Sequence, residues 1–281
     1  MKKSISQWSF AGGISIPKGC MKLAKDAGFE AIELALDEDG PINLGSTREE
    51  IEEIARTARK IGIEISSVAT GLFWKYPFTS ASRETREKAE EITVKMLDVA
   101  QWLGTDAILV VPGVVGVDFI PEGEVIPYDL AYARSMEALK ELAREAERRR
   151  VYIGIENVWN KFLLSPLEMR DFVDRLGSEY VGVYFDVGNV IATGYPEQWI
   201  RILGKRIKRL HFKDFRRAVG GLSGFVDLLE GDVNWSEVMK ALEEVGYDSY
   251  ATAEMLPPYA QYPEALIYNT SRAMDYIFGI T

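Results

Sequence analysis

The sequence is poor in two residue types that often carry protein chemistry. Its 281 residues include one cysteine, Cys20, and one histidine, His211. A single cysteine excludes an intrachain disulfide framework and is typical of a reducing compartment. No stretch approaches about 18 uninterrupted apolar residues, and no signal-peptide core follows the first three residues. We therefore expect a cytoplasmic protein that has no membrane partner.

Positive charge is scarce relative to negative charge. The chain has 33 lysines and arginines against 43 acidic residues, which gives a formal net charge of −10 and an isoelectric point of about 4.9. Such a chain gains little from the counterion release that drives binding to nucleic acids. We expect no nucleic-acid partner.

A repeated pattern runs through the chain, in which an acidic residue follows a glycine two positions later. Glycine just past a helix accepts the left-handed conformation that ends it, and a short β-rich run then follows. The pattern appears as "AGFE" (27–30), "IGIE" (61–64), "LGTD" (103–106), "LGSE" (176–179) and "VGYD" (245–248). The predicted strands are ISQWSF, AIELAL, IEISSVA, AILVV, VYIGIE, VGVYFD, IKRLHF and YATAEM.

Amphipathic patterns between these runs predict helices, most clearly over 47–62 and 133–150. Thr47 with Glu50 forms a predicted capping box, and Ser165-Pro166 with Glu168 predicts another helix start. Eight strand–helix units of roughly 35 residues predict an α/β fold, a (β/α)8 barrel. No linker divides the chain, so residues 1–281 are expected to form a single domain. A doubly wound open sheet is the alternative, but no Gly-x-Gly-x-x-Gly turn follows the first strand.

Four consecutive predicted strands carry a polar residue at or near their carboxyl ends. These residues are Glu156, Asp186, His211 and Glu254. In a (β/α)8 barrel such positions surround one pocket, where three buried carboxylates would repel each other unless a cation neutralised them. Three oxygen ligands and one nitrogen suit Mn²⁺, Mg²⁺ or Co²⁺ better than a thiolate-rich zinc site. Of these we expect Mn²⁺.

Two further segments are candidates for the walls of this pocket. The aromatic segment 71–78, which includes Trp74, follows the third strand, and Trp8 is expected in the first strand. These rings either exclude water and stack on a sugar or belong to ordinary packing at the rim. Segment 213–232 is either a mobile lid, with Lys213 and Arg216 meeting a phosphate or carboxylate, or a plain surface insertion.

At these residues the sequence resembles the sugar phosphate isomerase/epimerase superfamily of xylose-isomerase-like barrels. Within it, the chain is most similar to the D-tagatose 3-epimerase and L-ribulose-5-phosphate (L-xylulose-5-phosphate) 3-epimerase branches. The resemblance covers nearly the whole chain through "LAKDAGFEAIEL", "IEN", "FDVGN", "HFKD" and "AEM", in that order. It implies a metal-dependent enzyme that acts on a sugar or sugar phosphate as a homodimer or homotetramer.

The resemblance also implies roles for individual residues. Glu156, Asp186, His211 and Glu254 correspond to the metal ligands of the family, and Glu156 and Glu254 to its proton-transfer pair. Arg217 corresponds to a substrate-contacting arginine, whose replacement is expected to raise KM much more than it lowers kcat. Two positions depart from the tagatose epimerases: Asn189 replaces a histidine, and Phe162 or Leu163 replaces a substrate-contacting glutamate. Asn189, Lys213 and Trp74 complete the expected substrate contacts.

The expected reaction is inversion of a ketose at C3 through an ene-diolate, with one glutamate on each face of the sugar. An aldose–ketose or hydroxypyruvate isomerase would use the same ligands but transfer a proton on one face. An inosose-type dehydratase would remove a β-hydroxyl instead. An apurinic-site endonuclease needs several histidines, and a sugar-binding barrel without catalysis does not need two opposed glutamates.

Overall fold

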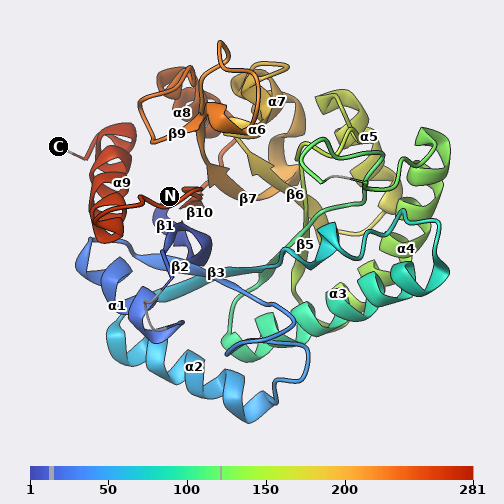
Figure 1. Ribbon diagram of the computed structural model, residues 1–281, viewed down its shortest axis with the longest axis horizontal. Helices are drawn as coiled ribbons and strands as arrows, with labels where there is room; N and C mark the ends of the chain where they lie inside the picture. The colour runs from blue at the N-terminus through green and yellow to red at the C-terminus, as the bar shows by residue number, and fades with distance from the viewer. Residues whose placement is uncertain (13–15, 121, 281) are drawn as a thin grey trace.

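The computed structural model describes residues 1–12, 16–120 and 122–280. Eight parallel strands close into a barrel, in which neighbours follow the order β1-β10-β7-β6-β5-β4-β3-β2 (Figure 1). These strands are β1 (Lys2–Ser6), β2 (Ala31–Ala35), β3 (Glu64–Ala69), β4 (Ala107–Val110), β5 (Tyr152–Glu156), β6 (Val181–Asp186), β7 (Ile207–Phe212) and β10 (Tyr250–Ala253). The predicted (β/α)8 barrel is confirmed, and the closure of β1 onto both β2 and β10 excludes the open sheet.

Helices surround the barrel on its outside (Figure 1). They are α1 (Lys18–Asp26), α2 (Arg48–Ile61), α3 (Arg83–Leu103), α4 (Tyr128–Arg149), α5 (Pro166–Leu176), the short α6 (Gly188–Ile191), α7 (Pro196–Leu203), α8 (Trp235–Glu244) and α9 (Pro263–Phe278). Each long helix turns an apolar stripe toward the strands, so the core consists of the barrel interior and the layer between strands and helices.

The structure contains the capping interactions that the sequence predicts at the ends of two helices. Thr47 and Glu50 form the capping box of α2, and the Ser165 side chain accepts a hydrogen bond from the Glu168 amide at the start of α5. Gly62 ends α2 with φ of 79°, a left-handed conformation that a side chain would strain. Glycine at this position therefore turns the chain from α2 into the following strand.

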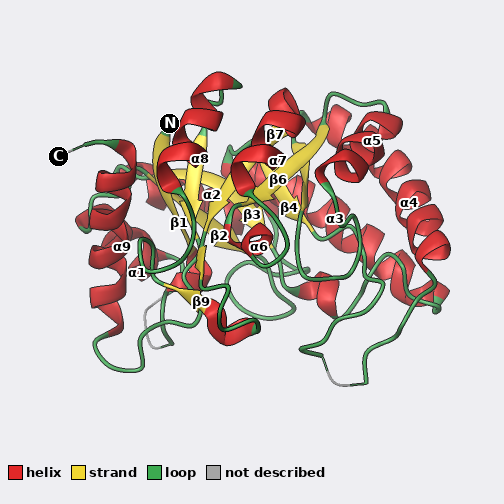
Figure 2. Ribbon diagram, turned by 90° about the horizontal axis from the view of Figure 1, so that it is seen from above, coloured by secondary structure: helices red, strands yellow, loops and turns green. Residues whose placement is uncertain are grey.

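The loops that follow the carboxyl ends of the strands gather on one side of the barrel, where β9 also lies (Figure 2). On this side β8 (Asp214–Phe215) pairs antiparallel with β9 (Phe225–Val226). This ribbon belongs to segment 213–232, whose structure bears directly on the functional site.

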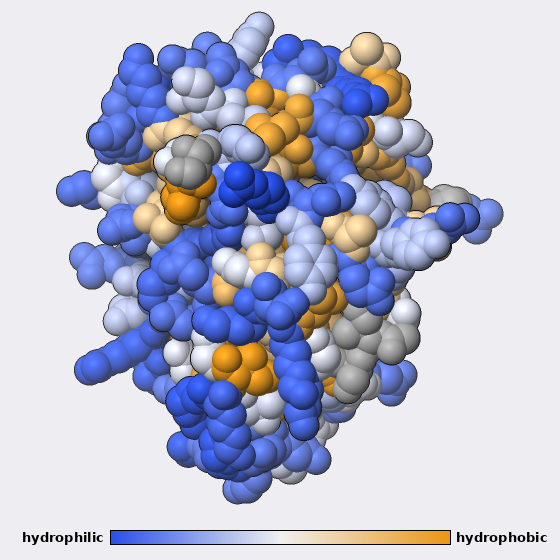
Figure 3. Space-filling view, turned by 90° about the vertical axis from the view of Figure 1, so that its left-hand side faces the viewer, coloured by the Kyte–Doolittle hydropathy of each residue, from blue (hydrophilic) through white to orange (hydrophobic). Residues whose placement is uncertain are grey.

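The outer surface carries most of the charge. On the face that Figure 3 shows, hydrophilic residues predominate and hydrophobic ones form small groups between them. Among the described residues, no helix combines the length and the apolar character needed to cross a lipid bilayer.

Candidate active site

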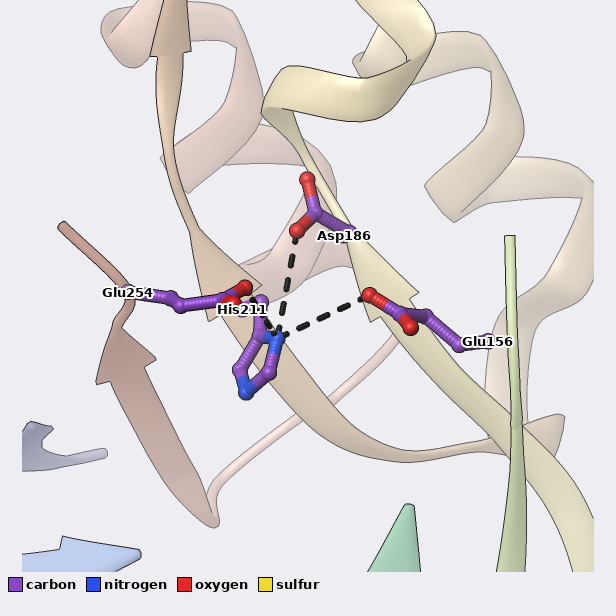
Figure 4. A group of neighbouring side chains, drawn as sticks. All are labelled: Glu156, Asp186, His211 and Glu254. Carbon is purple, nitrogen blue, oxygen red and sulfur yellow. Dashed lines mark ion pairs between the residues drawn. The ribbon is translucent and has the colours of Figure 1, made fainter. Parts of the chain in front are cut away.

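Four ionisable side chains converge at the carboxyl ends of β5, β6, β7 and β10. Glu156 and Asp186 are the last residues of β5 and β6, His211 is the penultimate residue of β7, and Glu254 follows β10 directly. Each offers one ligand atom, and these atoms all lie within 4.8 Å of one another. All four residues are buried, and Figure 4 shows the carboxylates arranged around one nitrogen of the imidazole.

That nitrogen is Nδ1 of His211. It lies 3.1 Å from Glu254 Oε2, 3.8 Å from Glu156 Oε1 and 3.9 Å from Asp186 Oδ2. Among the described residues, three buried atoms of this group, His211 Nδ1, Asp186 Oδ2 and Glu254 Oε2, make no hydrogen bond of good geometry, although the Lys213 ammonium lies near both carboxylate oxygens. Such buried polar atoms are rare, and a divalent cation would coordinate all three at once. The donor set therefore fits a metal that prefers oxygen and imidazole ligands.

The other imidazole nitrogen is held by Glu33, a residue that sequence reasoning missed. His211 Nε2 lies 3.0 Å from Glu33 Oε1, and Ser67 and Tyr184 donate hydrogen bonds to Glu33 Oε2 at 2.8 and 2.6 Å. A carboxylate only accepts, so Nε2 carries the proton and Nδ1 is directed toward the three carboxylates. The available signal was one acidic residue within the apolar strand run "AIELAL".

Two asparagines hold the carboxylates of β5 and β6 in position. Asn157 Nδ2 donates to the Asp186 carbonyl, and its Oδ1 accepts from the Asp186 amide, both at 2.8 Å. The backbone amide of Asn189 donates to Asp186 Oδ1 at 2.8 Å, and the side-chain Nδ2 of Asn189 lies 3.5 Å from Glu156 Oε1. One oxygen of Asp186 is thus occupied, whereas its Oδ2 faces His211.

Lys213 places its ammonium beside the same carboxylates. Its Nζ lies 2.5 Å from Glu254 Oε2 and 3.2 Å from Asp186 Oδ2. Lys213 follows His211 by two residues, so the strand alternation directs both side chains to the same side. The lysine therefore belongs to the floor of the site. From the sequence we expected Lys213, as part of segment 213–232, to contact a phosphate or carboxylate of the substrate.

Burial and these charges shift the pKa values of the group in opposite directions. Burial raises the pKa of Glu156 to about 7, and His211 and Lys213 offset this only in part. Burial likewise raises the pKa of Asp186. Burial also opposes ionisation of Glu254, but Lys213 and His211 outweigh it and lower the pKa of that carboxyl to about 2. The two glutamates thus differ in their affinity for a proton, as groups that exchange protons in catalysis commonly do.

A cavity of about 420 Å³ opens onto Glu156 and Glu254 of this group. Glu156, Glu254, Asn189, Lys213 and Trp74 line it, so the structure brings these predicted residues together. The aromatic residues of its wall are Trp8, Trp74, Phe119, Trp159 and Phe225.

Trp8 reaches the wall from a position that was predicted incorrectly. It was expected in a strand over 5–10, but β1 ends at Ser6, and Trp8 lies in the 3₁₀-helical turn Gln7–Ser9. The Ser6 side chain accepts a hydrogen bond from the Trp8 amide at this turn. A side-chain cap of this kind competes with continuation of the strand.

Arg217 does not line this cavity. Its Nε donates to the Ile191 carbonyl at 2.9 Å, and its guanidinium lies over the Tyr195 ring. Phe162 and Leu163, the two candidates for the position where the resemblance implied a glutamate, are also absent from the wall, and Phe162 packs against other aromatic rings. The role of Arg217 as a substrate contact therefore stays a prediction.

Segment 213–232 is folded around the carboxylate of Asp214. Asp214 Oδ1 accepts from the amides of Phe215 and Val233, and Oδ2 accepts from the Leu229 amide and the Trp235 indole, at 2.9–3.1 Å. Arg216 pairs with Glu230 within the segment. Part of this segment lines the cavity, and the expected contact of Arg216 with a substrate anion stays a prediction.

The barrel and its four-residue centre define a (β/α)8 protein that has a candidate metal site. Residues 21–272 match the family model described as Xylose isomerase-like TIM barrel, and the chain belongs to this family. This confirms the family resemblance.

Relatives of the chain include sugar epimerases. L-ribulose-5-phosphate 3-epimerase UlaE of Escherichia coli strain K12 is 24% identical over 268 residues, which are 92% of this chain and 87% of the relative. D-psicose 3-epimerase of Enterocloster bolteae is 32% identical over 127 residues, 43% of this chain and 39% of the relative. A crystal structure of D-psicose 3-epimerase in the presence of D-fructose superimposes with a TM-score of 0.82 at 18% identity, covering 100% of this chain and 99% of the other. This structural likeness shows a shared fold.

Proposed function

We propose that the protein is a divalent-metal-dependent epimerase that inverts C3 of a ketose through an ene-diolate. The observation that carries this proposal is the placement of two glutamates on opposite sides of one site. Glu156 ends β5 and Glu254 follows β10, while β6 and β7 lie between these strands in the barrel. A flat intermediate between the two side chains would present one face to each. The names of the relatives, which are ketose 3-epimerases, support the same reaction.

The metal would be held by Glu156, Asp186, His211 and Glu254, and Mn²⁺ is the ion that we expect, with Mg²⁺ or Co²⁺ as alternatives. When bound, such a cation polarises the carbonyl and hydroxyl oxygens of the sugar and stabilises negative charge that develops on them. Glu33 would keep Nδ1 of His211 directed toward that ion, because it holds Nε2 from the other side.

The protein side chains would carry the proton transfers. In one direction Glu156 would remove the C3 proton and Glu254 would return a proton to the opposite face, and the roles exchange in the reverse reaction. In the absence of a cation, burial raises the pKa of Glu156 to about 7, and coordination to a cation would lower it. Asn189 and Lys213 would contact the oxygens of the sugar near the reacting carbons, and Trp74 would pack against its carbon face.

The test is to replace each glutamate by glutamine. Gln keeps an oxygen for the metal and removes the base, so Glu156→Gln and Glu254→Gln should both lose epimerisation. At least one variant should still exchange the C3 hydrogen with D₂O without inverting the centre, as read by NMR in the presence of Mn²⁺. Near-normal turnover by either variant would contradict the two-base scheme and favour an isomerase that acts on one face.

Some sequence predictions stay open alongside this proposal. They concern a single domain over residues 1–281, a homodimer or homotetramer, a cytoplasmic location and the absence of nucleic-acid and membrane partners. Size-exclusion chromatography with light scattering measures the oligomeric state directly.

A further inference from the structure

The cavity wall is chemically uniform away from the four-residue centre. Most of its other lining residues are apolar, and these include Val158, Trp159, Leu222, Phe225 and Leu256. Most of its polar side chains either belong to the centre or are adjacent to it, as Asn189 and Lys213 are. The carboxylate of Asp214 also lines the cavity, but both of its oxygens accept hydrogen bonds from the surrounding segment. The end of a bound sugar that is remote from the metal would therefore meet mainly carbon atoms.

Positive charge is confined to one side chain of this wall. Lys213 is the only cation among the described residues that line the cavity. Its Nζ lies next to Glu254 and Asp186 on the floor and 5.4 Å from the centre of the Phe225 ring. The residues outside the described ranges are Gly13–Ser15, Pro121 and Thr281, none of which carries a positive side chain.

Four cations of nearby loops make contacts outside the cavity lining. Their contacts are those of Lys75 with Glu38, Lys161 with Asp118, Arg216 with Glu230 and Arg217 with the Ile191 carbonyl. A phosphate dianion is ordinarily held by arginine or lysine side chains or by several backbone amides. Apart from Lys213, the described wall offers no cationic side chain to hold such an ester.

We propose that the substrate is an uncharged ketose and not a ketose phosphate, and that its remote end packs against the apolar wall. This inference rests on the proposed epimerase function and decides its substrate class. An unpaired phosphate in this wall would lose hydration without gaining a partner, and the net charge of −10 would oppose its approach. The carbon face of a free sugar, in contrast, can stack on Trp159 or Phe225.

Matched pairs of substrates test the inference. We would compare L-ribulose with L-ribulose 5-phosphate and D-psicose with D-psicose 6-phosphate, using the Mn²⁺-loaded protein and C3 hydrogen exchange in D₂O. We expect kcat/KM for the better free sugar to exceed that of its phosphate by about tenfold or more. A preference for either phosphate ester would overturn the inference and leave the epimerase function intact.

Absence of exchange with all four compounds would count against the proposed function instead. The intrinsic fluorescence of the cavity tryptophans, titrated with the same pairs, then tests the inference separately. Tighter binding of a free sugar would support it, and tighter binding of an ester would overturn it.

Two sets of variants test whether the lack of positive charge in the wall causes the preference for a free sugar over its phosphate ester. Leu222 is about half exposed at the wall, so Leu222→Lys should be tolerated. It should raise the ratio of kcat/KM for the ester to kcat/KM for the free sugar by about tenfold, whereas Leu222→Gln should leave this ratio unchanged. Equal ratios in the two variants would contradict the electrostatic basis. Because Lys213 belongs to the proposed sugar contacts, Lys213→Met is tested by the same fluorescence titration and not by turnover. The ratio of ester affinity to free-sugar affinity should stay unchanged, and a selective loss of ester binding would show that Lys213 binds phosphate and would overturn the inference.

Discussion

Glu33 controls which nitrogen of His211 faces the candidate metal site. It is fully buried, and its pKa is lowered because His211, Tyr184 and Ser67 outweigh the cost of burial. Glu33→Gln should reduce Mn²⁺ affinity by about 10- to 100-fold, since such supporting contacts orient a ligating imidazole. His211→Ala should reduce it further, because it removes the nitrogen ligand of the group.

Isothermal titration with Mn²⁺ measures both effects, with Tyr184→Phe as a control that removes one hydrogen bond to Glu33 and keeps its carboxylate. Wild-type affinity in His211→Ala would remove this residue from the ligand set.

The role of Arg217 can be determined by measuring the kinetic constants and the thermal stability of the same variant. Sequence similarity predicts a substrate contact, for which Arg217→Ala raises KM with a much smaller change in kcat. The contacts with Ile191 and Tyr195 instead make Arg217 a clamp between two loops. A purely structural role would instead lower Tm and leave KM within about twofold of the wild type. A KM increase at unchanged Tm would support the substrate contact that the sequence predicts.

At the level of elements, Asp214 organises the β8–β9 ribbon and the loop around it. Asp214→Ala would leave four hydrogen-bond donors without their acceptor, each at a cost of about 1–3 kcal/mol where it stays buried. We expect the segment over 216–232 to open and to become much more sensitive to limited proteolysis. Asp232→Ala is the matched control, because this exposed residue of the same segment accepts one bond from the Arg217 amide. Equal cleavage of the two variants would refute the organising role of Asp214.

For the whole molecule, metal binding should stabilise the fold. Without a cation, three buried carboxylates lie close together with only His211 and Lys213 to compensate them. A ligand that binds only the folded state stabilises it by about 2.7 kcal/mol at a free concentration of 100 Kd. Mn²⁺ should therefore raise Tm over the value in EDTA, as measured by differential scanning calorimetry. The increase should be lost in His211→Ala, and an equal increase in that variant would place the stabilising ion elsewhere.

The sequence alone was sufficient to predict the barrel and to identify the four residues that meet at its centre. Strand–helix alternation and residues such as Gly62 and Thr47, which end and begin helices, are local signals that neighbouring residues generate. The positions of Glu156, Asp186, His211 and Glu254 also followed, because parallel strands of a closed barrel all end at the same rim.

Only the tertiary structure decided what surrounds these four residues. Glu33 and His211 are 178 positions apart in the sequence and meet across the barrel interior. Likewise, Lys213 lies on the floor of the site, whereas Arg217 bonds to the Ile191 carbonyl and does not line the cavity, although both follow β7 in the sequence. Such contacts depend on strand register, side-chain direction and the packing of distant loops. A local pattern therefore identifies which residues stand at the rim, but the packed fold determines which of them touch.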